Sequence, residues 1–117
     1  MKVNVQQLVG DLCMTYEDGA KLHNAYRAAF DSGDFVELDF AGTRIFVSRF
    51  FNAAVGQLLK DHGIEEVRRR LHCVNLPFAG AAPLRQSMEN AERYFRDPKF
   101  QVALDRVLET EAHATEA

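Results

Sequence analysis

The first third of the chain changes from an alternating to a helical pattern of apolar positions. Apolar and polar residues alternate over residues 2–8, which predicts a strand, and residues 12–14 predict a short second strand after a turn at Gly10-Asp11. Apolar residues then recur every three or four positions. This spacing predicts a helix with Thr15 as its N-cap and a C-terminal stop at Ser32-Gly33.

The middle of the chain contains the most apolar segment. Residues 34–40, DFVELDF, predict a central strand, and their apolar content favours a strand covered on both faces. Residues 43–47, TRIFV, extend or follow this strand. The helical period returns at Ser48, which is the expected N-cap of a helix that ends with Gly63 as a left-handed C-cap.

The remaining segments alternate in the same way. Residues 64–70 predict a short helix, and LHCVNLP predicts a strand ended by Pro77. The loop FAGAAP should lead into a helix with Pro83 in its first turn, and Asp97-Pro98 should start a last helix. The apolar stripe of that last helix is Phe100, Leu104, Val107 and Leu108.

Strands that alternate with helices predict an α/β fold. We expect one domain over residues 1–112, with a three- to four-stranded sheet flanked by helices and an extra C-terminal helix. Residues 113–117 are polar and alanine-rich, and a disordered tail is expected there.

Composition and charge narrow the class of protein. The net charge of −3, from 17 acidic and 14 basic residues, provides no positive field for nucleic acid. No apolar run approaches the roughly 18–20 residues that cross a bilayer, and no signal peptide is recognisable. A cytoplasmic protein without membrane contact is therefore expected. The two cysteines, Cys13 and Cys73, are far apart and should be reduced.

Catalytic and cofactor motifs are absent from the sequence. It contains neither a phosphate-binding glycine pattern nor a GxSxG nucleophile elbow, and the four histidines are isolated. We therefore expect no metal site and no cofactor. Glu37 and Asp39 share one face of the predicted central strand and are the best candidate for acid/base chemistry. The run Arg68-Arg69-Arg70 follows two glutamates and predicts a solvated helix face.

Three segments together resemble a known family. They are YEDGAKL in the first long helix, VELDFAGTRIFVSRFFNAAVGQLL through the central strand and next helix, and VNLPFAGAAPLRQSMENAERYF near the end. They resemble the STAS-like domains of unknown function, small bacterial relatives of the anti-sigma-factor antagonists. The resemblance implies a STAS-like fold and a role in bacterial signal transduction.

The resemblance also implies a functional surface. In the wider STAS group, the turn between a strand and the following helix carries a serine that a partner kinase phosphorylates, and the same surface docks the partner. Here Leu38-Asp39-Phe40 is similar to the strand, and Val47-Ser48-Arg49 is similar to the turn. The usual phosphoacceptor falls at Arg49, so Ser48 either accepts phosphate with a shift of one residue or only caps its helix.

The leading hypothesis is a non-enzymatic module that binds a kinase-like or anti-sigma-like protein. Phe50 is an exposed anchor for that partner if it faces solvent, or a core residue if both faces of its helix are covered. The expected surface consists of Asp39, Thr43, Ser48, Arg49, Phe50 and Asn52.

Two other functions remain open. A small enzyme or ligand-binding domain would use side chains near the carboxyl ends of the strands, namely Glu37, Asp39, Ser48 and Asn75. An oligomerisation unit would pack the last helix, residues 98–112, against a second copy of the chain.

Overall fold

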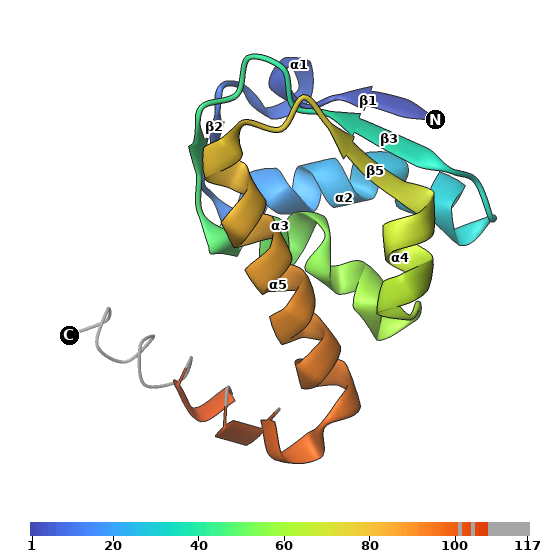
Figure 1. Ribbon diagram of the computed structural model, residues 1–117, viewed down its shortest axis with the longest axis vertical. Coiled ribbons are helices and arrows are strands. Elements are labelled where there is room, and N and C mark those ends of the chain that lie inside the picture. The colour runs from blue at the N-terminus through green and yellow to red at the C-terminus, as the bar shows by residue number, and fades with distance from the viewer. Residues whose placement is uncertain (101, 104, 108–117) are drawn as a thin grey trace.

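The computed structural model describes residues 1–100, 102–103 and 105–107 (Figure 1). It confirms an α/β fold with strands and helices that alternate along most of the chain. In chain order the elements are β1 (Lys2–Asn4), α1 (Val5–Val9), β2 (Leu12–Cys13), α2 (Tyr16–Asp31), β3 (Val36–Asp39), β4 (Ile45–Phe46), α3 (Ser48–Ala54), the 3-10 helix η1 (Gly56–Lys60), α4 (Ile64–Arg70), β5 (Leu71–Val74) and α5 (Phe78–Arg96).

Two small parallel sheets organise the described part of the chain. The larger one has the order β1-β3-β5, so β3 is its central strand as predicted. In this sheet Val3 pairs with Leu38, and Leu38 pairs with Cys73. β4 does not extend β3 but pairs with β2 in a second sheet, where Leu12 lies opposite Ile45. The main sheet therefore has three strands, and the TRIFV segment belongs elsewhere.

The three-stranded sheet is covered by helices on one face only. The side chains of Val36, Leu38 and Phe40 are buried, whereas Glu37 and Asp39, which alternate with them, are half-exposed. Figure 1 shows α2, α3, α4 and α5 gathered on one side of this sheet, with α1 at the end of β1. The prediction of cover on both faces is wrong because Phe35, which raised the apolar count, lies before β3 and is 58% exposed.

The core lies between this sheet and helices α2 and α3. Gly19 of α2 lies against the backbone of Phe50, so the two helices come very close there. The buried Tyr26 hydroxyl donates a hydrogen bond of 2.5 Å to the carbonyl oxygen of Ala54, at the end of α3. The largest fully buried side chains are Tyr26, Phe30, Phe40, Phe50, Phe51, Leu22, Leu38, Leu59, Val5, Val36, Val55 and Val67.

Side-chain caps decide where the first helices begin. The strand predicted over residues 2–8 stops at Asn4, because its side-chain oxygen accepts a hydrogen bond of 2.9 Å from the Gln7 amide and starts α1. The predicted cap at Thr15 is confirmed, since its hydroxyl accepts 3.0 Å from the Asp18 amide.

Two other helix boundaries differ from the prediction. α3 ends at Ala54 and gives way to η1, and Gly63 is not a left-handed C-cap but precedes α4 in an extended conformation. α5 begins at Phe78, five residues before Pro83, so the FAGAAP segment is helix and not loop. Pro83 is tolerated there because it removes only one backbone hydrogen bond close to the helix start.

The charged run at the end of α4 is only partly solvated. Arg68 is exposed and pairs with Glu65, as a solvated helix face predicts. Arg70 is buried, which that prediction missed, and its guanidinium donates to the carbonyl oxygens of Phe30 at 3.0 Å and Asp34 at 2.9 Å. It also stacks over the Phe30 ring at 4.0 Å, so it joins α4 to the end of α2.

The C-terminal prediction is tested only in part. The Asp97 carboxylate accepts a hydrogen bond of 3.0 Å from the Lys99 amide, and residues 98–100, 102–103 and 105–107 are helical. Leu104, Leu108 and the predicted tail lie outside the described residues. No helix within the described ranges is long and apolar enough to span a membrane.

Candidate functional site

The turn between β3 and β4 is held by internal hydrogen bonds. Thr43 is buried, and its hydroxyl donates a bond of 2.6 Å to the carbonyl oxygen of Phe40. Its amide bonds the same oxygen at 3.1 Å. Thr43 therefore closes the turn from inside and does not present its side chain to a partner.

Ser48 is the first residue of α3 and not its N-cap. The cap is Val47, which has no side chain able to accept a hydrogen bond, so the predicted capping role is wrong. The carbonyl oxygen of Ser48 accepts a bond of 3.0 Å from the buried Ser87 hydroxyl of α5. The Ser48 side chain is half-buried, and phosphorylation at this residue stays a prediction.

Phe50 is completely buried, which excludes it as an exposed anchor. Its ring meets Phe51 edge to face, with centroids 5.3 Å apart. Phe51 in turn stacks on Phe46 at 6.0 Å. Both phenylalanines are covered because α3 lies between α2 and α5, so the alternative in which the two are core residues is the correct one.

Arg49 and Asn52 are the predicted site residues that do face solvent. They lie three positions apart on the exposed side of α3. The Arg49 guanidinium makes no ion pair with any other described residue. This end of α3 therefore presents a positive charge to any molecule that approaches it.

A neighbouring apolar surface was missed by the sequence analysis. Cys13 and Phe46 point inward from the β2–β4 sheet, so the residues on either side of them point outward. These outward side chains, each between 38% and 45% exposed, are Leu12, Met14, Ile45 and Val47, and we call them the ribbon face. The alternation in TRIFV was the available signal, because it places Ile45 and Val47 on the side opposite Phe46.

Phe78 lies in the first turn of α5 and is 96% exposed. α5 packs against β4 through Gly80, where an added β-carbon would approach the Phe46 ring at 3.2 Å. Figure 1 shows this end of α5 beside the two-stranded sheet. Phe78 and Arg49 thus belong to helices that adjoin the sheet of the ribbon face.

Asp39 and Asn75 meet at the carboxyl edge of the main sheet. The Asn75 amide donates a bond of 3.0 Å to the Asp39 carboxylate, which also accepts 2.9 Å from the Ala41 amide. These two hydrogen bonds hold the pKa of Asp39 below its usual range. Asn75 has a φ of 54°, a left-handed conformation that asparagine tolerates. Asp39 is thus a structural acceptor that joins β3 to the segment after β5.

The rest of the predicted acid/base set is dispersed. Glu37 faces Lys2 at 4.0 Å, and Ser48 is joined to α5 through its backbone. Within the described part of the chain, no three side chains of His, Cys, Asp or Glu are grouped to hold a metal ion. Burial raises the pKa of Cys13 to about 11 and that of Cys73 to about 12, so both thiols are protonated and unreactive at neutral pH.

Comparison with known families identifies a match. No curated protein and no solved structure was found to match the chain. A model of the family described as a STAS-like domain of unknown function (DUF4325) matches residues 18–77, about half of the chain. The matched part runs from the first turn of α2 to the residue before α5 and includes β3, β4 and α3. The chain therefore belongs to the family of STAS-like domains of unknown function.

Proposed function

We propose that this domain is a non-enzymatic regulatory module of signal transduction that binds a protein partner through the ribbon face and the start of α3. The exposed ribbon face carries the proposal, because apolar side chains that are grouped on a surface, and not scattered singly, often mark a site that binds another molecule. It adjoins the strand-to-helix turn at Val47-Ser48-Arg49, the segment whose counterpart docks partners in the wider STAS group.

The charges beside the ribbon face indicate which charge the partner surface should carry. Arg49 is exposed and has no ion pair with a described residue, so it favours a partner that places a carboxylate or phosphate at the rim. Arg44 is the other nearby cation, but Asp11 lies 3.8 Å from it. We expect a regulator, kinase-like or anti-sigma-like, whose surface has an apolar centre and an acidic rim.

Ser48 would regulate this contact if it were phosphorylated. A phosphate adds about −1.5 to −2 charges at neutral pH, here on the residue before Arg49 at the start of α3. The added charge would offset the positive charge of Arg49 at this end of α3 and repel the acidic rim of the partner. Phosphorylation would therefore release the partner.

The ligand-binding alternative is less well supported. Asp39 and Asn75 do meet, but they hydrogen-bond each other, and neither Glu37 nor Ser48 joins them. Oligomerisation through the last helix rests largely on Leu104 and Leu108, which lie outside the described residues.

The test is a binding measurement with an identified partner. Proteins captured by the purified domain from a bacterial lysate are identified, produced separately and titrated against the domain by calorimetry. Ile45→Asp places a charge in the ribbon face and should weaken binding at least about tenfold, as loss of one interface anchor does. Phe78→Ser should also weaken it.

Phe35→Asp is the matched control. Phe35 is also apolar and exposed, but it lies before β3 and outside the ribbon face, so this variant should bind like wild type. The proposal fails if Ile45→Asp and Phe78→Ser leave the affinity unchanged, or if Phe35→Asp weakens binding as much as they do. Circular dichroism of each variant shows whether the fold is retained.

A further inference from the structure

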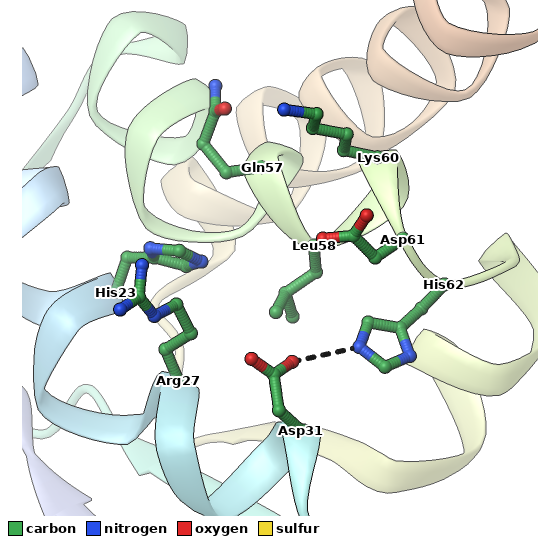
Figure 2. Close-up of a pocket in the computed structure, with 8 residues that line it drawn as sticks. All are labelled: His23, Arg27, Asp31, Gln57, Leu58, Lys60, Asp61 and His62. Carbon is green, nitrogen blue, oxygen red and sulfur yellow. Dashed lines mark hydrogen bonds and ion pairs between the residues drawn. The ribbon is translucent and has the colours of Figure 1, made fainter.

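A polar cavity lies between α2 and η1, away from the ribbon face. Its volume is about 210 Å³, and Figure 2 shows side chains converging on it from both sides. α2 contributes His23, Arg27 and Asp31, while η1 and the residues after it contribute Lys60, Asp61 and His62. Nothing in the proposed function uses these residues.

The cluster of charged side chains around His62 is electrically neutral. His62 directs one ring nitrogen to the Asp31 carboxylate at 3.0 Å and the other to the Glu66 carboxylate at 2.7 Å. Carboxylates only accept hydrogen bonds, so both ring nitrogens donate and His62 is an imidazolium. Arg70 adds a second positive charge 2.9 Å from Glu66. Two cations and two carboxylates thus cancel in this cluster.

The cavity wall also carries two cations, one from α2 and one from η1, that no described residue pairs with. Arg27 and Lys60 make no ion pair within the described part of the chain. Figure 2 shows the Arg27 side chain beside the His23 ring, and Lys60 on the η1 side of the cavity, directed toward Gln57. Asp61 is the remaining acid on the wall, so Arg27, Lys60 and Asp61 together leave one net positive charge.

His23 adds a neutral donor beside Arg27 on α2. Burial, together with the charge of Arg27, lowers the pKa of His23, so the ring is uncharged at neutral pH. A neutral imidazole still has one N–H with which to hydrogen-bond a ligand. The three side chains would thus offer two cations and one neutral donor to the same small volume.

We propose that this cavity binds a small oxyanion, a phosphate or a carboxylate group, between Arg27 and Lys60. Guanidinium and ammonium groups are the side chains that bind such groups by charge-assisted hydrogen bonds. The cavity is smaller than the pockets that hold drug-sized ligands, so it takes one charged group and not a large molecule. A metal ion or an organic cation is disfavoured because the same two side chains would repel it.

Binding should leave a signature on His23. An anion beside the ring favours its charged form, so the pKa of His23 must rise when the site is filled. The pKa of His62 should change less, because Asp31 and Glu66 already neutralise that ring. A site made of exposed cations is weakened by solvent, and a dissociation constant in the millimolar range is expected.

The experiment is an NMR titration of the histidine ring protons with inorganic phosphate, and separately with acetate, at an ionic strength kept constant with potassium chloride. Saturable shifts at His23, with a raised pKa at saturation, are the expected result. Saturation by phosphate alone identifies a phosphate site, saturation by acetate alone a carboxylate site, and saturation by both a general oxyanion site. Saturation by neither overturns the proposal.

Three variants locate the site. Arg27→Gln and Lys60→Gln should each weaken binding at least about fivefold, because each removes one of the two cations. Arg85→Gln is the matched control, since Arg85 is an exposed arginine on α5 that does not line this cavity, and it should leave the affinity unchanged. Equal losses in all three variants, or none in the first two, would show non-specific attraction instead. These results do not depend on the ribbon face, so the two proposals fail separately.

Discussion

The contact between α2 and α3 predicts that Gly19→Ala destabilises the fold, although alanine is the better helix former. Gly19 is the fourth residue of α2. In an unobstructed helix interior this substitution would stabilise by about 1 kcal/mol. The sign of the change in the free energy of unfolding therefore shows whether tertiary packing or helix propensity dominates at this position.

The structure gives the size of the opposing effect. A β-carbon at Gly19 would collide with the carbonyl oxygen of Phe50 and would come 2.9 Å from the β-carbon of Ala53. Neither group is the flexible end of a side chain, so α3 as a whole must move away. Overpacking costs about 1–3 kcal/mol in stability. We expect a cost of about 3 kcal/mol at Gly19, because the obstructing groups are rigid. Subtracting the gain in propensity leaves a net loss of about 2 kcal/mol.

Urea unfolding followed by circular dichroism at 222 nm measures this loss, since the chain has no tryptophan to report it by fluorescence. With a slope of about 1–2 kcal/mol per molar urea, the midpoint should fall by about 1–2 M. Ala28→Gly is the control, because Ala28 is exposed in the same helix and should lose only about 1 kcal/mol from propensity. An unfolding midpoint for Gly19→Ala equal to or above that of wild type would refute the close approach of the two helices.

Three further predictions concern buried polar contacts. Arg70→Met should lower the free energy of unfolding by about 3 kcal/mol in the same assay, because it removes the guanidinium that pairs with Glu66 and bonds two carbonyl oxygens. Arg68→Met, at an exposed pair, should change it by less than about 0.5 kcal/mol. Tyr26→Phe should cost about 1–3 kcal/mol in thermal or urea unfolding, because the carbonyl oxygen of Ala54 loses a buried partner, and a neutral result would exclude that bond. Burial lowers the pKa of His62, but the hydrogen bonds to Asp31 and Glu66 outweigh it and raise the pKa above the usual value. The stabilisation by His62 should therefore be complete below about pH 6.5 and decline as the pH rises through the folded-state pKa, and a wild-type pH profile parallel to that of His62→Gln would contradict this.

Local signals in the sequence predicted much of the fold. The Thr15 cap, the spacing of apolar residues in α2 and the apolar β3 segment each depend on near neighbours, and all three are confirmed. Asn4 is an exception. Its place in an alternating run predicts a strand position, but its side chain caps α1 and ends the strand there.

The failures come from contacts distant in sequence. Phe50 has no local feature that buries it, and its cover comes from α2 on one side and α5 on the other. The sequence around Arg70 predicts a solvated charge. In the structure its hydrogen-bond acceptors are the carbonyl oxygens of Phe30 and Asp34, more than 35 residues away in the chain. The partner strand of β4 is likewise β2, which lies before α2 in the chain. Such pairings are set by packing and have no signature in a local window of sequence.

The parallel pairing of both sheets has a consequence for the order of assembly. β1 and β2 lie within the first 13 residues, yet their partners are β3 and β4, which come more than 30 residues later. During synthesis these strands leave the ribosome before β3 and β4, and the pairs seen in the structure form only after α2 and the strands beyond it have emerged. A fragment limited to the family-matched residues 18–77 would lack them, and it would expose one edge of β3 and one edge of β4.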